Sequence, residues 1–223
     1  MLRAPVGGSK PHGFPVVSPG TDSYTSRMKI RTHRLKTGFA VATLAFFGLS
    51  QVVLAGEPQA LELIKQANDY VGKNVRDKVV GIRSEKSVAT VTPNIWYAVY
   101  YDHDATFKTA EVKFGAGQEL EVRHPLRAPF AYTNDKDLLD QKIIQVNSDK
   151  AIKTAMAEPL LDKLTIRATQ LWLQNLDGVP TWKVRLWAQK LRHPNDDAEI
   201  GDVFVSAADG KVIRSDLHID RVD

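Results

Sequence analysis

The chain repeats one order of sequence patterns after residue 56. Each copy opens with apolar residues at helical spacing and continues with short runs in which apolar and polar residues alternate. Spacings of three and four residues predict a helix, and strict alternation predicts a strand with one buried face. Two such copies predict an α+β fold of two tandem modules, each a helix packed on a curved antiparallel sheet.

The first copy places its predicted helix directly before four strand-like runs. Gly72 ends the helix, and the Gly-rich stretch 115–117 supplies the last turn. The helical face carries Ala60, Leu63, Ile64, Ala67, Tyr70 and Val71. The expected strands are 78–83, 95–101, 110–114 and 119–123.

The second copy follows the same order. Ser148 and Asp149 can cap a short helix that ends before Pro159, because their side chains accept hydrogen bonds from free helical N–H groups. A turn at 177–180 separates the first two strands. The expected strands are 164–173, 182–187, 201–206 and 211–214.

A secretory leader is predicted at residues 28–55. A cationic stretch that starts at Met28 precedes the apolar run 38–54, and small residues at Val53 and Ala55 fit a signal-peptidase site. An uncleaved membrane anchor is the alternative, although the run is shorter than the roughly 20 apolar residues of a permanent span. Cleavage after Ala55 would place the mature protein in the periplasm or outside the cell.

The leader also accounts for the basic balance of the chain. Residues 1–55 hold seven of the 30 Lys and Arg residues and one of the 26 Asp and Glu residues, which leaves 23 basic and 25 acidic side chains in the rest. No nucleic-acid partner is expected, because such binding needs a cationic patch on the folded domain. Residues 1–27 show no hydrophobic period and are interpreted as disordered or as a mis-assigned extension.

Residue types that carry chemistry are sparse. The chain has no cysteine, which excludes disulfides, Cys-bound zinc and thiol catalysis. Asp102, His103 and Asp104 are candidate metal ligands, but they follow a strong strand without a second ligand cluster. The loop 193–199 holds several oxygen donors without the alternation or glycine of a calcium loop. We predict no catalytic residue, no metal site, no cofactor and no enzymatic activity.

The aromatic residues of the second copy indicate a binding surface. Trp182 begins a core face, and the alternation of a strand then turns Lys183, Arg185 and Trp187 to the opposite face. Phe204 is out of phase with the core residues of the next strand. These four residues are the candidate binding residues. The alternative is that the outer faces of the two modules pack against each other or are covered by the linker.

Two stretches, 178–185 and 201–213, resemble the PepSY domain in their Trp-led strand, Asp-Gly-Lys turn and Val-rich last strand. The resemblance is best over 147–218 and weaker over 57–125, where the sequence at 115–118 departs from the Asp-Gly-Lys turn. It implies a non-catalytic module outside the cytoplasm, of the kind found in the propeptides of thermolysin-type peptidases. The family defines no catalytic residues that could be transferred to this chain.

These observations predict PepSY-like modules at 56–125 and 147–223, joined by a linker at 126–146. The expected function is to bind an exported peptidase or another envelope protein without chemistry. The membrane is expected to be contacted only through the leader, during export. A carrier of small molecules or envelope components, with a pocket between helix and sheet, is the second hypothesis. An uncharacterised hydrolase is the third.

Overall fold

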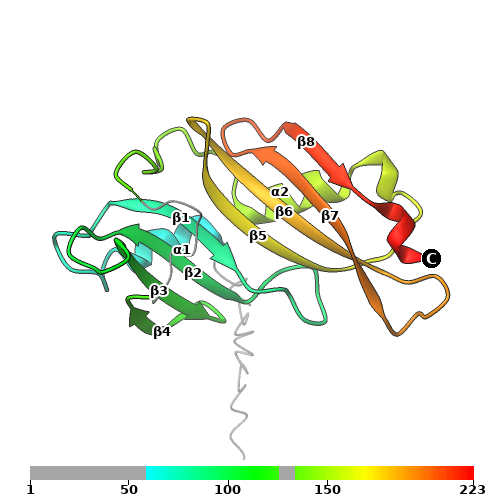
Figure 1. Cartoon of the computed structure of the whole chain (residues 1–223), viewed down its shortest axis with the longest axis horizontal. Coiled ribbons are helices and arrows are strands. Elements are labelled where there is room, and N and C mark those ends of the chain that lie inside the picture. Colours follow the sequence, from blue (N-terminus) through cyan, green and yellow to red (C-terminus); the bar gives the residue numbers. More distant parts are fainter. Residues whose placement is uncertain (1–58, 126–133) are drawn as a thin grey trace, which may run out of the picture. The chain divides into compact units, whose positions relative to one another are not determined.

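Eight strands form one antiparallel sheet in the computed structural model, which describes residues 59–125 and 134–223 (Figure 1). The strands lie in the order β4-β3-β2-β1-β5-β6-β7-β8, so that β1 and β5 meet at the centre. The predicted extension 1–27, the predicted leader 28–55 and the first part of the predicted linker, 126–133, lie outside the described residues.

Each half of the sheet is preceded by one short helix. Compared with the predicted runs, β5 starts later and reaches Leu176, and β7 already begins at Asp197. The helices are α1 (Ala60–Ala67) and α2 (Ser148–Met156), and the 3₁₀ turns are η1 (Pro159–Leu161) and η2 (Ile219–Val222). The strands are β1 (Val79–Ser84), β2 (Ile95–Tyr101), β3 (Thr109–Gly115), β4 (Gln118–Arg123), β5 (Ile166–Leu176), β6 (Val179–Gln189), β7 (Asp197–Ser206) and β8 (Val212–Leu217).

Both helices cover the same face of the sheet. α1 packs on β1 and β2, and α2 packs on β5, β6 and β7; in Figure 1 both lie behind the strands. One hydrophobic core joins the apolar faces of the two helices to the inward residues of the sheet. The predicted core face of β6 is confirmed, since Trp182, Val184, Leu186 and Ala188 are fully buried in that core.

The central junction between β1 and β5 combines backbone and hydroxyl hydrogen bonds. Backbone pairing covers residues 81–83 and 172–174. Beyond it the Ser84 hydroxyl accepts the Leu171 N–H at 2.9 Å, and the Ser87 hydroxyl accepts the Thr169 N–H at 2.9 Å. These hydroxyls satisfy buried N–H groups of β5 where the two strands diverge.

Asn147 caps α2, in place of the predicted Ser148 and Asp149, and Asn147 and Ser148 together cap α1. The Asn147 side-chain oxygen accepts N–H groups from Ser148 at 2.9 Å and from Leu61 at 3.1 Å. The Ser148 hydroxyl accepts the Ala60 N–H at 3.3 Å. Gln59, the N-cap residue of α1, makes no side-chain capping bond. The start of α1 therefore depends on residues that begin α2.

The predicted fold of two separate helix-on-sheet modules is wrong. The structure is one continuous eight-stranded antiparallel sheet with two short helices. The edge of β1 pairs with β5, because an unpaired strand edge leaves N–H and C=O groups without partners. The alternative in which two outer faces pack on each other also fails, since both belong to one face of one sheet. No helix in the described residues has the length and apolar character needed to cross a membrane.

Candidate interaction face

The sheet face opposite the helices, here called the open face, carries one continuous row of side chains. Cross-strand pairing aligns one residue from every strand, and together these eight residues are called the central row. In sheet order the central row is Glu121, Lys113, Tyr97, Arg83, Trp172, Lys183, Phe204 and Arg214. Apart from Glu121 at one end, cationic and aromatic residues alternate along it.

The cations of the central row lie over its aromatic rings. The Arg83 guanidinium is 3.9 Å from the ring centre of Tyr97, and the Arg214 guanidinium is 4.1 Å from that of Phe204. The Lys183 ammonium is 5.0 Å from the ring of Trp172. Each such contact stabilises by about 0.5–1 kcal/mol at an exposed site. Tyr97 and Phe204 are buried, so the aromatic rings form a floor beneath partly exposed cations.

A buried carboxylate holds the first half of the open face together. The Glu111 side chain on β3 is fully buried and pairs with Arg83 at 2.9 Å and Arg123 at 2.9 Å. Arg83 comes from β1 and Arg123 from β4, so Glu111 ties three strands. Burial lowers the pKa of Arg123, but the hydrogen bond from Arg123 to Glu111 raises it, and the net direction is upward. Arg123 therefore remains charged.

A second carboxylate, Asp202 on β7, organises the other half. Arg185 donates to it at 2.8 and 3.1 Å, and the Lys183 ammonium lies 3.2 Å from its carboxylate. Burial raises the pKa of Asp202. The hydrogen bonds from Arg185 and the charge of Lys183 lower this pKa by a larger amount, so the net pKa lies below its usual value. The carboxylate is consequently ionised at neutral pH.

The Tyr97 phenol completes the first half. Its hydroxyl donates a hydrogen bond to Glu85, and burial together with this bond raises the pKa of Tyr97 above its usual value. The phenol therefore stays neutral near pH 7. Its ring supports the cations above it.

All four residues predicted for binding lie on the open face. Lys183 and Arg185 are partly exposed and share Asp202. Phe204 is 8% exposed, because it lies beneath Arg214. Trp187 is half-buried, with the Lys86 ammonium 4.7 Å from its ring centre. The surface these residues present is thus more cationic and less aromatic than the sequence suggests.

Several residues of the open face were not predicted to take part in binding. Trp172, Arg83 and Glu111 occupy outward positions of their strands, which alternation alone could have indicated. Their convergence could not be foreseen, because it requires β1 to lie beside β5 and Arg83 to reach across β2 to Glu111. The alternation of each strand is visible in the sequence, but the sequence does not show which strands lie side by side.

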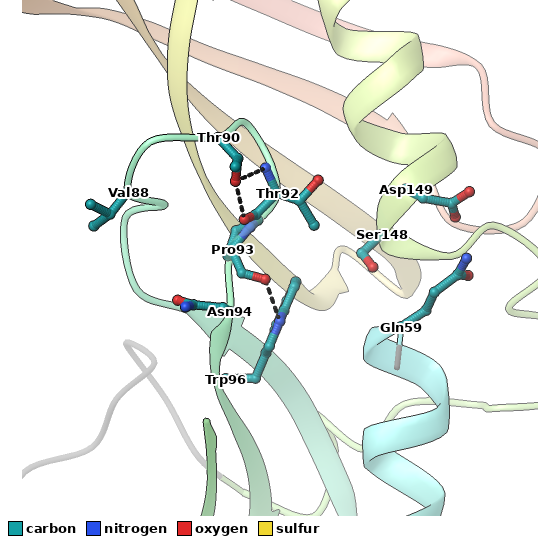
Figure 2. A pocket seen from close by; sticks show the side chains of 9 residues that line it. All are labelled: Gln59, Val88, Thr90, Thr92, Pro93, Asn94, Trp96, Ser148 and Asp149. Carbon is teal, nitrogen blue, oxygen red and sulfur yellow. Dashed lines mark hydrogen bonds between the residues drawn. The ribbon is translucent and has the colours of Figure 1, made fainter. Parts of the chain in front are cut away.

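A separate cavity of about 430 Å³ lies where the N-termini of α1 and α2 meet the loop before β2 (Figure 2). The Trp96 indole donates to the Pro93 carbonyl at 3.0 Å and forms one wall. The rest of the lining combines apolar side chains with hydroxyl, amide and carboxylate groups. The lining residues are Gln59, Val88, Thr90, Thr92, Pro93, Asn94, Trp96, Ser148 and Asp149. Trp182 does not line it: its indole is buried and donates to the Val146 carbonyl at 2.8 Å.

The two weaker ligand candidates lie apart from the open-face clusters. Asp102 pairs with His124 at 3.0 Å, while His103 and Asp104 are exposed. The segment 193–199 comprises a short loop and the first residues of β7. Within residues 59–125 and 134–223, no three His, Cys, Asp or Glu side chains gather in an arrangement that could hold a metal ion.

Comparison with known proteins identifies no relative. No protein-family model, no curated protein and no solved structure matches the chain.

Proposed function

We propose that this chain is an exported, non-catalytic binding module whose open face holds a protein or peptide partner outside the cytoplasm. The observation that carries the proposal is the central row: from β3 to β8 it alternates cations with aromatic rings, on a face that neither helix covers. Aromatic and Arg side chains dominate contact energy in many protein interfaces.

The ion pairs beneath the row favour binding by a rigid surface. Glu111 and Asp202 fix the guanidinium groups of Arg83, Arg123 and Arg185 in one geometry before any partner arrives. A side chain that is already ordered loses little conformational entropy on binding, and this loss otherwise costs about 0.5–1.5 kcal/mol per side chain. Preorganised cations and rings are therefore well suited to recognition.

The PepSY resemblance at 147–218 suggests the kind of partner. In that family the modules accompany exported peptidases, so an exported peptidase is the first partner to test for this chain. The proposal needs no catalytic residue of its own, because restraint of a peptidase requires only contact. The location outside the cytoplasm rests on the leader predicted at 28–55.

Export is tested by expressing the full-length chain in a bacterium and sequencing the N-terminus of the protein recovered outside the cytoplasm. The expected N-terminus is Gly56. Recovery of the chain only from the cytoplasm, with residues 28–55 attached, would contradict the proposed location.

Partner contact is tested by placing a photo-crosslinking amino acid at Trp187 on the open face and, as the control, at Lys153 on α2. Adducts with another envelope protein are expected from position 187 and not from position 153. Trp187→Ala should weaken partner capture by roughly 2 kcal/mol, about thirty-fold, with little change in melting temperature. Adducts from position 153 alone would move the binding surface to the helix side.

The cavity beside Trp96 supports a second candidate function, a carrier of small molecules or envelope components. Its volume of about 430 Å³ lies within the usual range for small-ligand sites. Native mass spectrometry of the exported protein tests this: a retained small molecule that is lost in a Thr92→Trp variant, which fills the cavity, would favour the carrier. If the masses of the wild type and the Thr92→Trp variant differ only by the substituted side chain, no ligand is retained, and this result would count against the carrier.

A further inference from the structure

The central row has a geometric property that selects a partner. Its eight positions hold cations at the second, fourth, sixth and eighth strands, which are Lys113, Arg83, Lys183 and Arg214 in sheet order. Rings occupy the third, fifth and seventh strands, and an acid occupies the first. Because the number of strands is even, reversing the row brings Arg83 opposite Trp172 and Arg214 opposite Glu121. The buried rings of Tyr97 and Phe204 stay beneath the cations of their own copy.

A second copy of the chain, laid face to face about a two-fold axis parallel to the strands at the β1–β5 junction, presents the row in this reversed order. Arg83 then faces Trp172 of the other copy, and Arg214 faces Glu121. A two-fold axis along the row would instead place each cation over itself. The charge pattern therefore favours one of these two symmetric arrangements, and a two-fold dimer uses the same surface on both copies.

The area of the open face is sufficient for a dimer. Eight strands about 4.8 Å apart and about six residues long cover roughly 34 by 20 Å, or about 700 Å² on each copy. A standard-size interface buries about 800 Å² per partner. Stacked sheets cross at about 30°, so the match is closest beside the axis, at Arg83 and Trp172. The outer pair relies on the length of the exposed Arg214 and Glu121 side chains.

Other routes to association are less favourable. The cations of the open face are largely matched by Glu111, Asp202 and Asp216, so the face does not select a partner of strongly acidic or basic charge. The outermost strands are poor templates for strand addition, because each carries a bulge, at Leu120 on β4 and at Ile213 on β8. Bulges at sheet edges oppose edge-to-edge pairing.

We infer that the open face takes a second copy of this chain, in a two-fold dimer whose axis runs along the β1–β5 junction. The inference deepens the proposed function, because it names an occupant of the same face. The dimer covers the central row until another partner displaces the second copy.

Crosslinking gives the first test, since the chain has no cysteine and a single introduced one reports unambiguously. Gln174 lies on the open face of β5 beside the predicted axis, opposite Gly81 in the register. Its Cα atoms in the two copies should be roughly 11 Å apart, given strand and sheet spacings of about 4.8 and 10 Å. In the full chain, Gln174→Cys should form a dimer with a short bismaleimide, and Lys65→Cys on exposed α1 should not.

Charge exchange gives the second test, measured by sedimentation equilibrium with circular dichroism to verify folding. Arg214→Glu and Glu121→Arg should each weaken the dimer about ten-fold or more, and the double variant should recover most of that loss. Arg214→Ala, which adds no repulsion with Asp216, should weaken the dimer less than Arg214→Glu.

Three results would overturn the dimer: a monomer at all concentrations up to about 100 μM, equal crosslinking at positions 174 and 65, or no recovery in the double variant. A heterologous adduct at position 187 in a strictly monomeric chain would leave the proposed function standing and remove only the dimer. A dimer without any adduct to another protein would support the dimer and contradict the proposed binding of a different partner.

Discussion

The two halves of the sheet differ in how they are stabilised, although each is a helix followed by four strands. In the first half, strands of six or seven residues are tied by a fully buried Glu111 between two arginines. In the second half, β5, β6 and β7 have ten or eleven residues, and Asp202 is partly exposed. The half with the shorter strands thus relies more on a buried ion pair.

The halves also differ in self-sufficiency at their helices. α2 is capped by Asn147 in its own half, whereas the first N–H groups of α1 are accepted by Asn147 and Ser148 of the other half. The first half therefore needs the second to complete its helix as well as to cover the edge of β1. This dependence favours one cooperative unit over two independent modules.

The largest effect is expected from removing the buried carboxylate of the first half. Glu111→Ala leaves Arg83 and Arg123 without their shared partner and should lower the free energy of unfolding by about 3–5 kcal/mol. Asp202→Ala should cost less, because water reaches that site. Urea unfolding of both variants measures the difference. Equal losses would mean that the two carboxylates contribute alike.

A smaller effect is expected from removing the shared cap. Asn147→Ala deletes the acceptor for one N–H group in each helix and should cost about 1–2 kcal/mol. Gln59→Ala is the matched control and should be nearly neutral, since Gln59 makes no side-chain capping bond. Hydrogen exchange should show faster exchange at the start of both helices in Asn147→Ala. Faster hydrogen exchange in α2 alone would contradict the proposed dependence of α1 on the second half.

The smallest effect is a pH dependence confined to the second half. The pKa of Asp202 is lowered in the folded protein, so its ion pairs stabilise the fold fully above the unfolded-state value of about 4. That contribution is lost as the pH falls through the lower folded-state pKa. The stability difference between wild type and Asp202→Asn should therefore shrink from pH 5 to pH 2. A constant difference over this range would show that the charge of Asp202 contributes little.

The candidate site was predictable in its orientation and not in its composition. Alternation along β6 places Lys183, Arg185 and Trp187 on one face, and the structure has them there. Alternation cannot reveal that Arg214 covers Phe204 or that Asp202 neutralises two cations, because those contacts depend on β6, β7 and β8 being neighbours in a particular register. Register is a property of the sheet as a whole.

The sequence by itself determined the local elements: which runs become strands, which become helices and which side of β6 is buried. These follow from backbone preferences and side-chain periodicity, which act over a few residues. Only the tertiary structure decided that the two sets of strands share one sheet. That outcome depends on satisfying the exposed edges of β1 and β5 and the free N–H groups of α1 with partners 86 to 93 residues away. Such partners leave no periodic signal, because any two unpaired edges offer the same N–H and C=O groups.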